Sequence, residues 1–471
     1  MPHELRVRLA AYAIAALGVC GAVPASAQQP AAPGCPGFGW AEGLGAYQKA
    51  DAPFPTEDTK NLPTPDCNFH EWSFEAWVWA TWLNNDGIPR FMTLPTENDL
   101  LSNDVSAAAV HPRTLQLAAR STVAHDLPGY SEGAGAFVEA DGNVLVAPNG
   151  YPVYTSVHMN QTYFNTAKQN LIATGAYQSG QPNETFPVGS AVFKATWLRL
   201  DPGQAAPAGT YTTQAQVPVL TVLRTKSTIA IVPVRGQFVT ATVALVGLHV
   251  VGVTVNHPEF LWGTFEHNLN TPTVPDNTFT PSPSISSPSN FTLYAANTPY
   301  STVNIANNPP VLTFNAATQR FSPVNNAVLE NRTGGENQPN GPGNVMAVSA
   351  QGQNFLQNEK PPQSLFSNYF LGGTVWMAPG TFNLNSDQTT AVGSVNLANT
   401  TAETFVQYPT NTNMQNVQNC FMCHNATSYS FQTPPPAKLV NRLVAVSHAL
   451  AVGTDYAVPN LIAGPAPKSP R

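Results

Sequence analysis

Cys420, Cys423 and His424 stand in the order C-x-x-C-H near the C-terminus, and this spacing is the strongest constraint that the sequence places on the fold. Each of two thiols three positions apart can form a thioether with one vinyl group of a haem, and the adjacent histidine then reaches the iron as its proximal ligand. The motif therefore predicts one covalently attached haem c, held by Cys420, Cys423 and His424. The rest of the chain has to pack around this group.

Three other interpretations of the motif remain open. A structural zinc site needs four protein ligands, and no second pair of cysteines occurs at this spacing. A redox-active C-x-x-C disulfide would favour a βαβ context, which the flanking sequence does not show. An ordinary disulfide between Cys420 and Cys423 would leave His424 without a role.

Residues 1–27 have the pattern of a secretory signal peptide. Arg6 and Arg8 precede an apolar run over residues 9–23, and residues 25–27 form a small-residue cleavage site, Ala-Ser-Ala. Cleavage after Ala27 predicts a periplasmic or secreted protein, and haem c is attached outside the cytoplasm. The apolar run 243–255 has only 13 residues, so we expect no membrane-spanning segment in the mature chain.

The mature chain of 444 residues is long enough for one large domain or two to three ordinary ones. It keeps 18 of the 20 Lys and Arg residues and 26 of the 27 Asp and Glu residues, so its formal net charge is −8. Because the chain has no basic face to release counterions, we expect no nucleic-acid partner. A periplasmic redox partner or a small-molecule substrate fits this composition.

Cys35 and Cys67 remain once the haem motif takes two of the four mature cysteines. In an oxidising compartment these two thiols are expected to form a structural disulfide. A redox switch is the functional alternative for the same pair. The bridge would tie a Pro- and Gly-rich arm, residues 28–65, to the segment that follows it.

The fold class predicted by the pattern is mainly β, an antiparallel sandwich or barrel-like body with a few helices. Short β-prone runs are separated by Gly, Pro and Asn, at 143–147, 191–200, 210–213, 227–234 and 238–255. The aromatic and apolar residues Phe69, Trp72, Ala76, Trp79 and Leu83 recur at helical spacing, while Trp77 and Trp82 fill another side, so this helix is expected to be buried. We therefore expect a signal peptide (1–27), a β-rich body (28–394) and a haem attachment segment (395–471) with a helix over 437–450.

The sixth ligand of the iron has several candidates. His249 and His267 flank an aromatic stretch that could form the distal side of a haem, with Glu266 orienting a histidine that acts as ligand or general base. His448 follows the motif by 24 residues, Met346 and Met377 precede it, and no methionine follows Met422. A vacant or water-filled sixth position is the remaining alternative.

Four blocks of the sequence resemble bacterial exported proteins usually labelled cytochrome c family proteins. These are residues 72–83, residues 186–197, residues 245–267 and the stretch Leu397-Ala-Asn-Thr-Thr with Glu403-Thr-Phe-Val-Gln that leads to the C-x-x-C-H motif. The resemblance implies a covalent haem in the periplasm and supplies no substrate. It adds weight to His249 and to Glu266 and His267 as candidates.

Together these features predict a periplasmic monohaem c-type protein that transfers electrons or acts as a haem-dependent oxidoreductase. The long body in front of the haem segment indicates a second task, such as binding a substrate against the haem. Two alternatives remain: a β-rich binding or scaffold protein in which the haem is structural, and a metal-binding or thiol-redox protein without haem.

Overall fold

The computed structural model divides the chain into Met1–Ala31 and Ala32–Arg471, and only the second unit contains residues that the structure describes. The described residues are 35, 39–58, 65–96, 99–100, 114–117, 139, 143–174, 184–224, 229–274, 285–307, 310–338, 340–378, 380–382, 390–407, 419–425, 446–447 and 462–463. The expected signal peptide lies outside them, as does the expected helix over 437–450 except for Val446 and Ser447.

The helix α2 spans Pro65–Thr81, and every described side chain from Asp66 to Thr81 is buried. This confirms the prediction that the helix is buried. The helix begins at Pro65, before Phe69, the first residue of the predicted pattern, because proline is favoured in the first helical turn and Asp66 suits the positive N-terminal end. The disulfide between Cys35 and Cys67 ties the N-terminal arm to this helix, as predicted.

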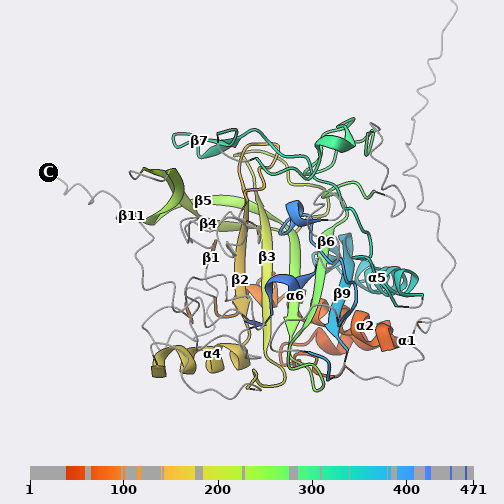
Figure 1. The fold of residues 1–471 in the computed structure, drawn as a ribbon. Coiled ribbons are helices and arrows are strands. Elements are labelled where there is room, and N and C mark those ends of the chain that lie inside the picture. The colour runs from red at the N-terminus through yellow and green to blue at the C-terminus, as the bar shows by residue number, and fades with distance from the viewer. Residues whose placement is uncertain are drawn as a thin grey trace, which may run out of the picture. The chain divides into compact units, whose positions relative to one another are not determined.

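Nine strands form one mixed sheet, so the expectation of a mainly β body is confirmed (Figure 1). The strands are β1 (Leu115–Gln116), β2 (Val153–Met159), β3 (Ala191–Arg199), β4 (Thr212–Arg224), β5 (Ile229–Gly252), β6 (Leu261–His267), β9 (Tyr369–Met377), β10 (Ala391–Gly393) and β11 (Ile462–Ala463). Two pairings, β1 with β4 and β11 with β5, are parallel, and the others are antiparallel. A separate ribbon joins β7 (Thr313–Asn315) to β8 (Arg320–Ser322).

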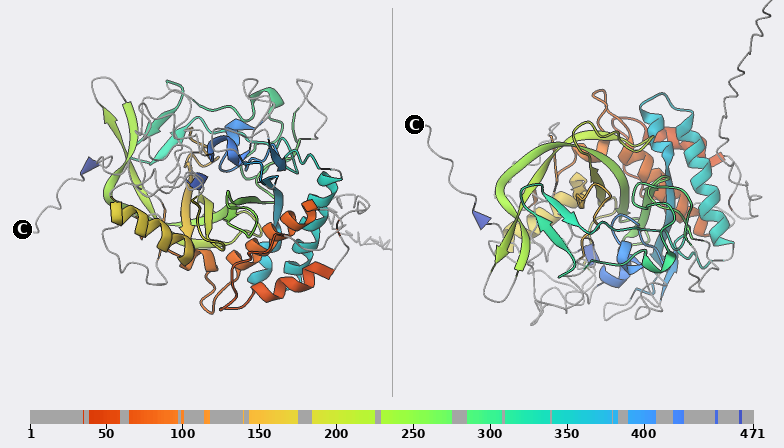
Figure 2. Two further views of the ribbon diagram at one scale, coloured as in Figure 1. Left: turned by 60° about the horizontal axis from the view of Figure 1, so that its bottom comes forward. Right: turned by 90° about the horizontal axis from the view of Figure 1, so that it is seen from above.

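The long strand β5 is the centre of this sheet. Along one edge, residues 243–252 of β5 pair with β3. Along the other edge β5 pairs first with β4, through residues 229–244, and then with β6, through residues 247–252. Figure 2 shows how strongly β4 and β5 curve. The stretch 238–255, predicted as one or two buried strands, is thus mostly the second half of one strand.

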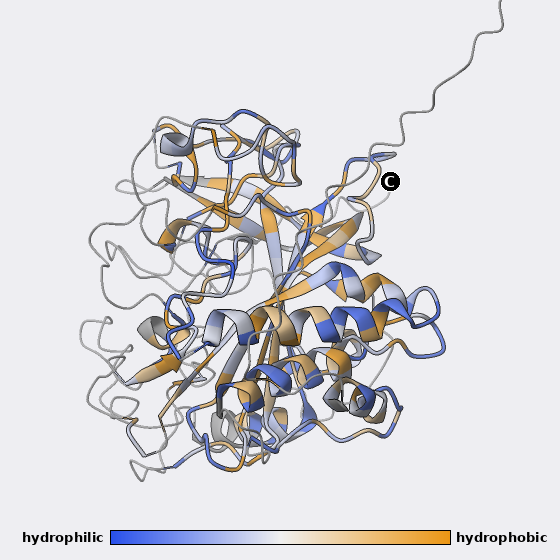
Figure 3. Ribbon diagram, turned by 90° about the vertical axis from the view of Figure 1, so that its right-hand side faces the viewer, coloured by the Kyte–Doolittle hydropathy of each residue, from blue (hydrophilic) through white to orange (hydrophobic). Residues whose placement is uncertain are grey.

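Among the described residues, one face of the sheet is covered by helices and not by a second sheet, which differs from the expected sandwich. The helix α5 (Gly341–Gln357) packs beside α2 and against β9, and the short α1 (Gly39–Gly43) contacts α5. Figure 3 views the molecule from this helical side, with largely hydrophobic strands behind the helices. Ring stacking between Trp77 of α2 and Phe265 of β6, with centroids 4.5 Å apart, joins the two layers.

The remaining helices are short or lie at the edge. They are α4 (Gln161–Thr174), α6 (Cys420–Cys423), η1 (Leu44–Tyr47), η2 (Arg90–Thr93), η3 (Tyr300–Thr302), η4 (Gln363–Asn368) and η5 (Thr404–Val406). No helix among the described residues is long and apolar enough to cross a membrane.

Side chains alternate between the two faces of the sheet. Phe265 points to the helical face, whereas its neighbours Thr264 and Glu266 point to the other. On that second face lie residues 397–407, called here the threonine loop, and residues 419–425, which carry the haem motif. Asn399 of the threonine loop donates from Nδ2 to Thr264 Oγ1 at 2.8 Å. The haem motif and the strand residues predicted to form the site therefore lie on the same face of the sheet, the one that α2 does not cover.

Candidate functional site

The motif begins on the single helical turn α6, Cys420–Cys423, which is anchored to the body at both ends. Asn419 caps the turn, because its Oδ1 accepts a hydrogen bond from Phe421 N at 3.0 Å while its Nδ2 donates to the carbonyl oxygen of Val395 at 2.9 Å. Phe421 is fully buried in an apolar cluster with Trp262, Met377 and Val446. Cys420 packs against the same cluster.

His424 is held by a backbone carbonyl and an indole ring. Its Nδ1 lies 2.9 Å from the carbonyl oxygen of Val446, and its ring lies 4.3 Å from the ring of Trp262, centroid to centroid. Burial lowers the pKa of His424 to about 4, against the raising effect of the bond to Val446. His424 is therefore neutral near pH 7, with its proton on Nδ1 and its lone pair on Nε2.

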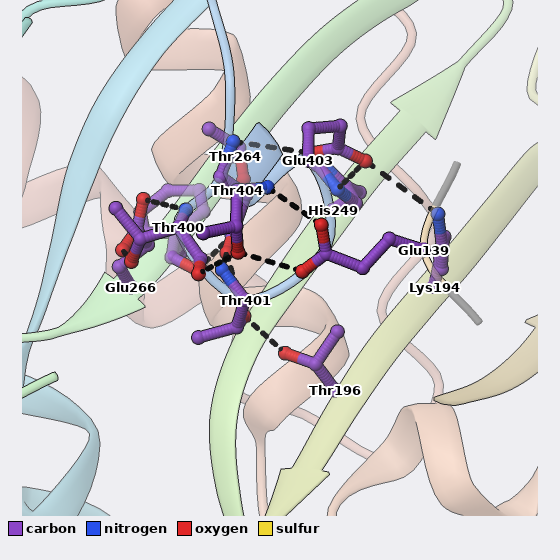
Figure 4. Close-up of polar contacts among 12 residues, drawn as sticks. Glu139, Lys194, Thr196, His249, Thr264, Glu266, Thr400, Thr401, Glu403 and Thr404 are labelled. Carbon is purple, nitrogen blue, oxygen red and sulfur yellow. Dashed lines mark hydrogen bonds and ion pairs between the residues drawn. The ribbon is translucent and has the colours of Figure 1, made fainter. Parts of the chain in front are cut away.

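Two buried glutamates, Glu139 and Glu266, and the partly buried Glu403 position the threonine loop through its backbone N–H groups (Figure 4). Glu139 accepts from Thr404 N at 2.8 Å, Glu266 accepts from Thr400 N at 2.9 Å, and Glu403 accepts from Asn399 N at 3.0 Å. The hydroxyls of Thr404 and Thr400 bond to the same carboxylates. Because each carboxylate accepts more than one hydrogen bond, the loop has one defined position on the sheet.

Glu403 joins His249 and Lys194 into a small charged cluster on the same face (Figure 4). Its Oε1 lies 3.2 Å from His249 Nε2 and 3.5 Å from Lys194 Nζ. Burial alone would raise the pKa of Glu403, but the charges of His249 and Lys194 and the hydrogen bonds from His249 and the Asn399 backbone lower it to about 2. Glu403 is thus ionised at every physiological pH.

The charged cluster lies near the motif. Lys194 on β3 pairs with His249 on β5, and His249 pairs with Thr264 on β6, so these three residues form one row across the sheet. Trp262, which contacts His424, lies two residues from Thr264 on the same strand and the same face. The charges of Lys194, Glu403 and His249 each influence the pKa of His424, after the larger effects of burial and the Val446 carbonyl.

Of the predicted site residues, His249 lies on the same face of the sheet as the motif, and His267 does not. The ring of His267 lies 5.0 Å from that of Tyr369, which in turn contacts Trp77 of α2, so His267 points to the helical face. Its neighbour Glu266 points to the opposite face. Glu266 holds Thr400 of the threonine loop and does not orient either histidine.

The other candidate iron ligands are distributed as follows. Met377 is buried in the apolar cluster around Phe421, and Met346 lies on α5 at the helical face. His448 lies outside the described residues, although its neighbour Val446 bonds to His424. Among the residues that the structure describes, no group of three His, Cys, Asp or Glu side chains is arranged to hold a metal ion.

Glu403 and Glu139 were missed as site residues by reasoning from the sequence. Glu403 stands in a polar stretch typical of a surface loop, yet its side chain is only 19% exposed. The one signal in the sequence was the position of Glu403 in a block that resembles other exported proteins. Comparison of the chain with protein-family models, with curated proteins and with solved structures finds no match.

Proposed function

We propose that this chain is a periplasmic monohaem c-type protein in which Cys420 and Cys423 carry the porphyrin as thioethers and His424 is the proximal iron ligand. The observation that supports this most is the 2.9 Å contact from His424 Nδ1 to the Val446 carbonyl. A metal-ligating histidine nearly always donates its second ring N–H to a carbonyl or carboxylate, which fixes the ring and directs the other nitrogen to the metal. When bound, a haem supplies one-electron transfer or the binding of a small ligand.

The surroundings of the motif fit such a group. Phe421, Trp262, Val446 and Met377 give the segment an apolar environment, which excludes water and keeps the imidazole neutral. A zinc site is the less suitable alternative, since no third or fourth donor is grouped with the motif in the described part of the chain. The disulfide between Cys35 and Cys67 fits an oxidising compartment, in which haem c is attached.

Within this class, we favour a haem-dependent oxidoreductase that acts on a small molecule over a simple electron carrier. A carrier needs only apolar residues around the haem. Here a nine-stranded body brings Lys194, His249 and Glu403 to the face where the motif lies. Charged groups held in a largely buried position are costly, and they are typical of sites that bind or protonate a substrate.

A structural haem in a β-rich binding protein is the second candidate function. One observation favours it: Phe421 of the motif is fully buried and belongs to an apolar cluster of the body, so a haem attached there would also complete the core. The two functions differ in the ferric spectrum. A high-spin spectrum that changes on addition of cyanide or peroxide supports the oxidoreductase, and a six-coordinate, low-spin spectrum that ignores both supports the structural role or a carrier.

The experiment that tests the proposal is an intact-mass measurement after expression in a host that matures c-type cytochromes. The denatured wild-type chain should retain the mass of one haem and give a pyridine haemochrome band. The Cys420→Ala/Cys423→Ala variant should lose both, whereas the matched Cys35→Ala/Cys67→Ala variant should keep them. A wild-type chain without added mass after this expression would overturn the proposal.

A further inference from the structure

His249 is held by a carboxylate at one ring nitrogen, as His257 is by Glu259, but it lies on the face of the sheet that carries the motif. Its Nε2 is occupied by Glu403, at 3.2 Å. Its Nδ1 has no hydrogen-bond partner among the described residues, and the side chain keeps 10% of its surface exposed. A histidine held by a carboxylate at one nitrogen, with the other nitrogen available, is the arrangement of a general acid–base group.

Glu403 is suited to hold this ring in place. Its second oxygen, Oε2, accepts from Asn399 N at 3.0 Å, so the carboxylate is fixed by its own loop. Lys194 lies beside Oε1 and keeps the carboxylate ionised even though it is largely buried. If His249 takes up a proton, the new positive charge lies next to this negative charge, which stabilises the imidazolium.

We propose that His249 is the proton acceptor for a weak acid that binds at the haem, with Glu403 as the positioning residue for its ring. This inference rests on the proposed function. The ligand class is a small, neutral, protic molecule, H–X, such as hydrogen cyanide or hydrogen peroxide. Glu266, the carboxylate expected from the sequence to orient a distal histidine, is excluded from that role by its bonds to Thr400.

The proton-transfer step is balanced without an oxidant or reductant. The H–X bond breaks, its proton moves to Nδ1 of His249, and the electron pair stays on X, giving the anion that a ferric haem held by Cys420, Cys423 and His424 would bind. The proton on Nε2 of His249 remains in its hydrogen bond to Glu403. Positively charged His249 can later return the proton when the ligand leaves. The step involves no oxidation or reduction.

The test is the rate at which cyanide binds to the ferric, haem-loaded protein. Hydrogen cyanide must lose its proton to bind, whereas carbon monoxide binds ferrous haem without proton transfer, so carbon monoxide controls for access to the haem. His249→Leu should slow cyanide binding by about 100-fold or more and leave carbon monoxide binding within about threefold, because a positioned base contributes about 10²–10⁴-fold. Glu403→Gln should slow cyanide binding by about 10-fold or more, since the ring keeps its place less well.

A matched control is offered by a second buried His–Glu pair. His257 Nδ1 lies 2.9 Å from Glu259 Oε1, and its ring contacts Phe69 of α2, on the helical side. His257→Leu should leave both rates unchanged. A pH profile adds a readout that a purely structural role would not move: the pH dependence of the wild-type cyanide rate should differ from that of His249→Leu, and Lys194, Glu403 and His424 are the other titratable groups around His249.

Failure of the inference is distinguishable from failure of the proposed function. A chain that carries no haem contradicts the proposed function. A chain that carries haem but whose cyanide rate is unchanged in His249→Leu contradicts only the role of His249. Equal slowing of cyanide and carbon monoxide would also overturn it, because the side chain would then act by shaping access to the haem.

Discussion

Gly247 and Thr401 approach each other so closely that a methyl group on Gly247 would lie 2.5 Å from Thr401 Oγ1. Thr196 Oγ1 would lie 2.6 Å from the same methyl group. Because Gly247 has no side chain, the threonine loop can pack directly against the backbone of β5. Gly247→Ala should lower the free energy of unfolding by about 1–3 kcal/mol, because the loop or the strand has to move. Urea unfolding measures this change.

Gly45→Ala is the control for this prediction. A methyl group at Gly45, in η1, would have no heavy atom within 4 Å, so the change should stay within about 0.5 kcal/mol. Gly247→Ala should also weaken the alignment of His249 by Glu403, since the threonine loop carries that carboxylate. Equal unfolding midpoints for the two variants would show that the close approach at Gly247 has no energetic weight.

The bridge from Cys35 to Cys67 closes a loop with a sequence separation of 32 residues. A cross-link of this span limits the unfolded chain and is worth about 3–4 kcal/mol on chain-entropy grounds. Cys35→Ala/Cys67→Ala should therefore lower the melting temperature by several degrees, and a reductant should lower that of the wild type but not of the variant. The prediction would be wrong if a reductant that acts on the unfolded wild-type chain left its melting temperature unchanged.

The raised pKa of Glu266 predicts that its contribution to stability decreases as the pH rises. Burial raises its pKa to about 7, against the lowering effects of Thr400 and Arg332, whereas the ordinary value is 4.5. The folded state therefore binds more protons than the unfolded state between these two values, and the contribution of Glu266 to stability is lost as the pH rises from about 4.5 to 7. Glu266→Gln should match the wild type near pH 4.5 and be more stable by about 3 kcal/mol at pH 8.

Glu403→Gln is the comparison, because the pKa of Glu403 is lowered whereas that of Glu266 is raised. The pKa of Glu403 is lowered to about 2, so its contribution is present above pH 4.5 and is lost as the pH falls toward 2. This variant should be less stable than the wild type by about 2–3 kcal/mol at pH 7, and the difference should shrink in acid. Unfolding midpoints measured from pH 3 to pH 8 test both. The same pH trend in the two variants would contradict the assigned shifts.

Features set by neighbouring residues were predictable from the sequence. The buried α2, the strand β3 and the long β-branched run of β5 follow from short-range patterns of apolar residues. The pairing of Cys35 with Cys67 followed from counting the cysteines. The helix α5 was missed because Gly341, Gly343 and Gly352 weaken its helical signal, while the lack of a side chain at Gly352 is what admits Phe74 of α2.

The polar site depends on contacts that no local pattern contains. Glu139 holds Thr404 across 265 residues of sequence, and Asn399 holds Thr264 across 135. Adjacent residues of a strand point to opposite faces, so Glu266 and His267 could not serve one site, although the sequence grouped them as candidates. Which of His249 and His267 faces the motif depended on the register between β5 and β6, which places His249 opposite Thr264, and the sequence does not contain this register.

His424→Ala tests the assignment of the proximal ligand separately from haem attachment. The thioethers belong to Cys420 and Cys423, so the variant should keep the mass of one haem while it loses the normal spectrum, because the iron no longer has its imidazole. Removal of the ring also leaves space beside Trp262 and below the Val446 carbonyl. Added imidazole should bind there, donate its N–H to that carbonyl and restore the spectrum.

The matched substitution is His257→Ala, which removes a buried histidine on the helical side. It should leave the haem spectrum unchanged with or without imidazole. Since both variants lose an imidazole ring that contacts an aromatic side chain, a general loss of packing would affect them alike, and only loss of the iron ligand would respond to imidazole. A normal spectrum in His424→Ala would show that another residue holds the iron, and Met377, buried in the same apolar cluster as Phe421, would then be the next residue to replace.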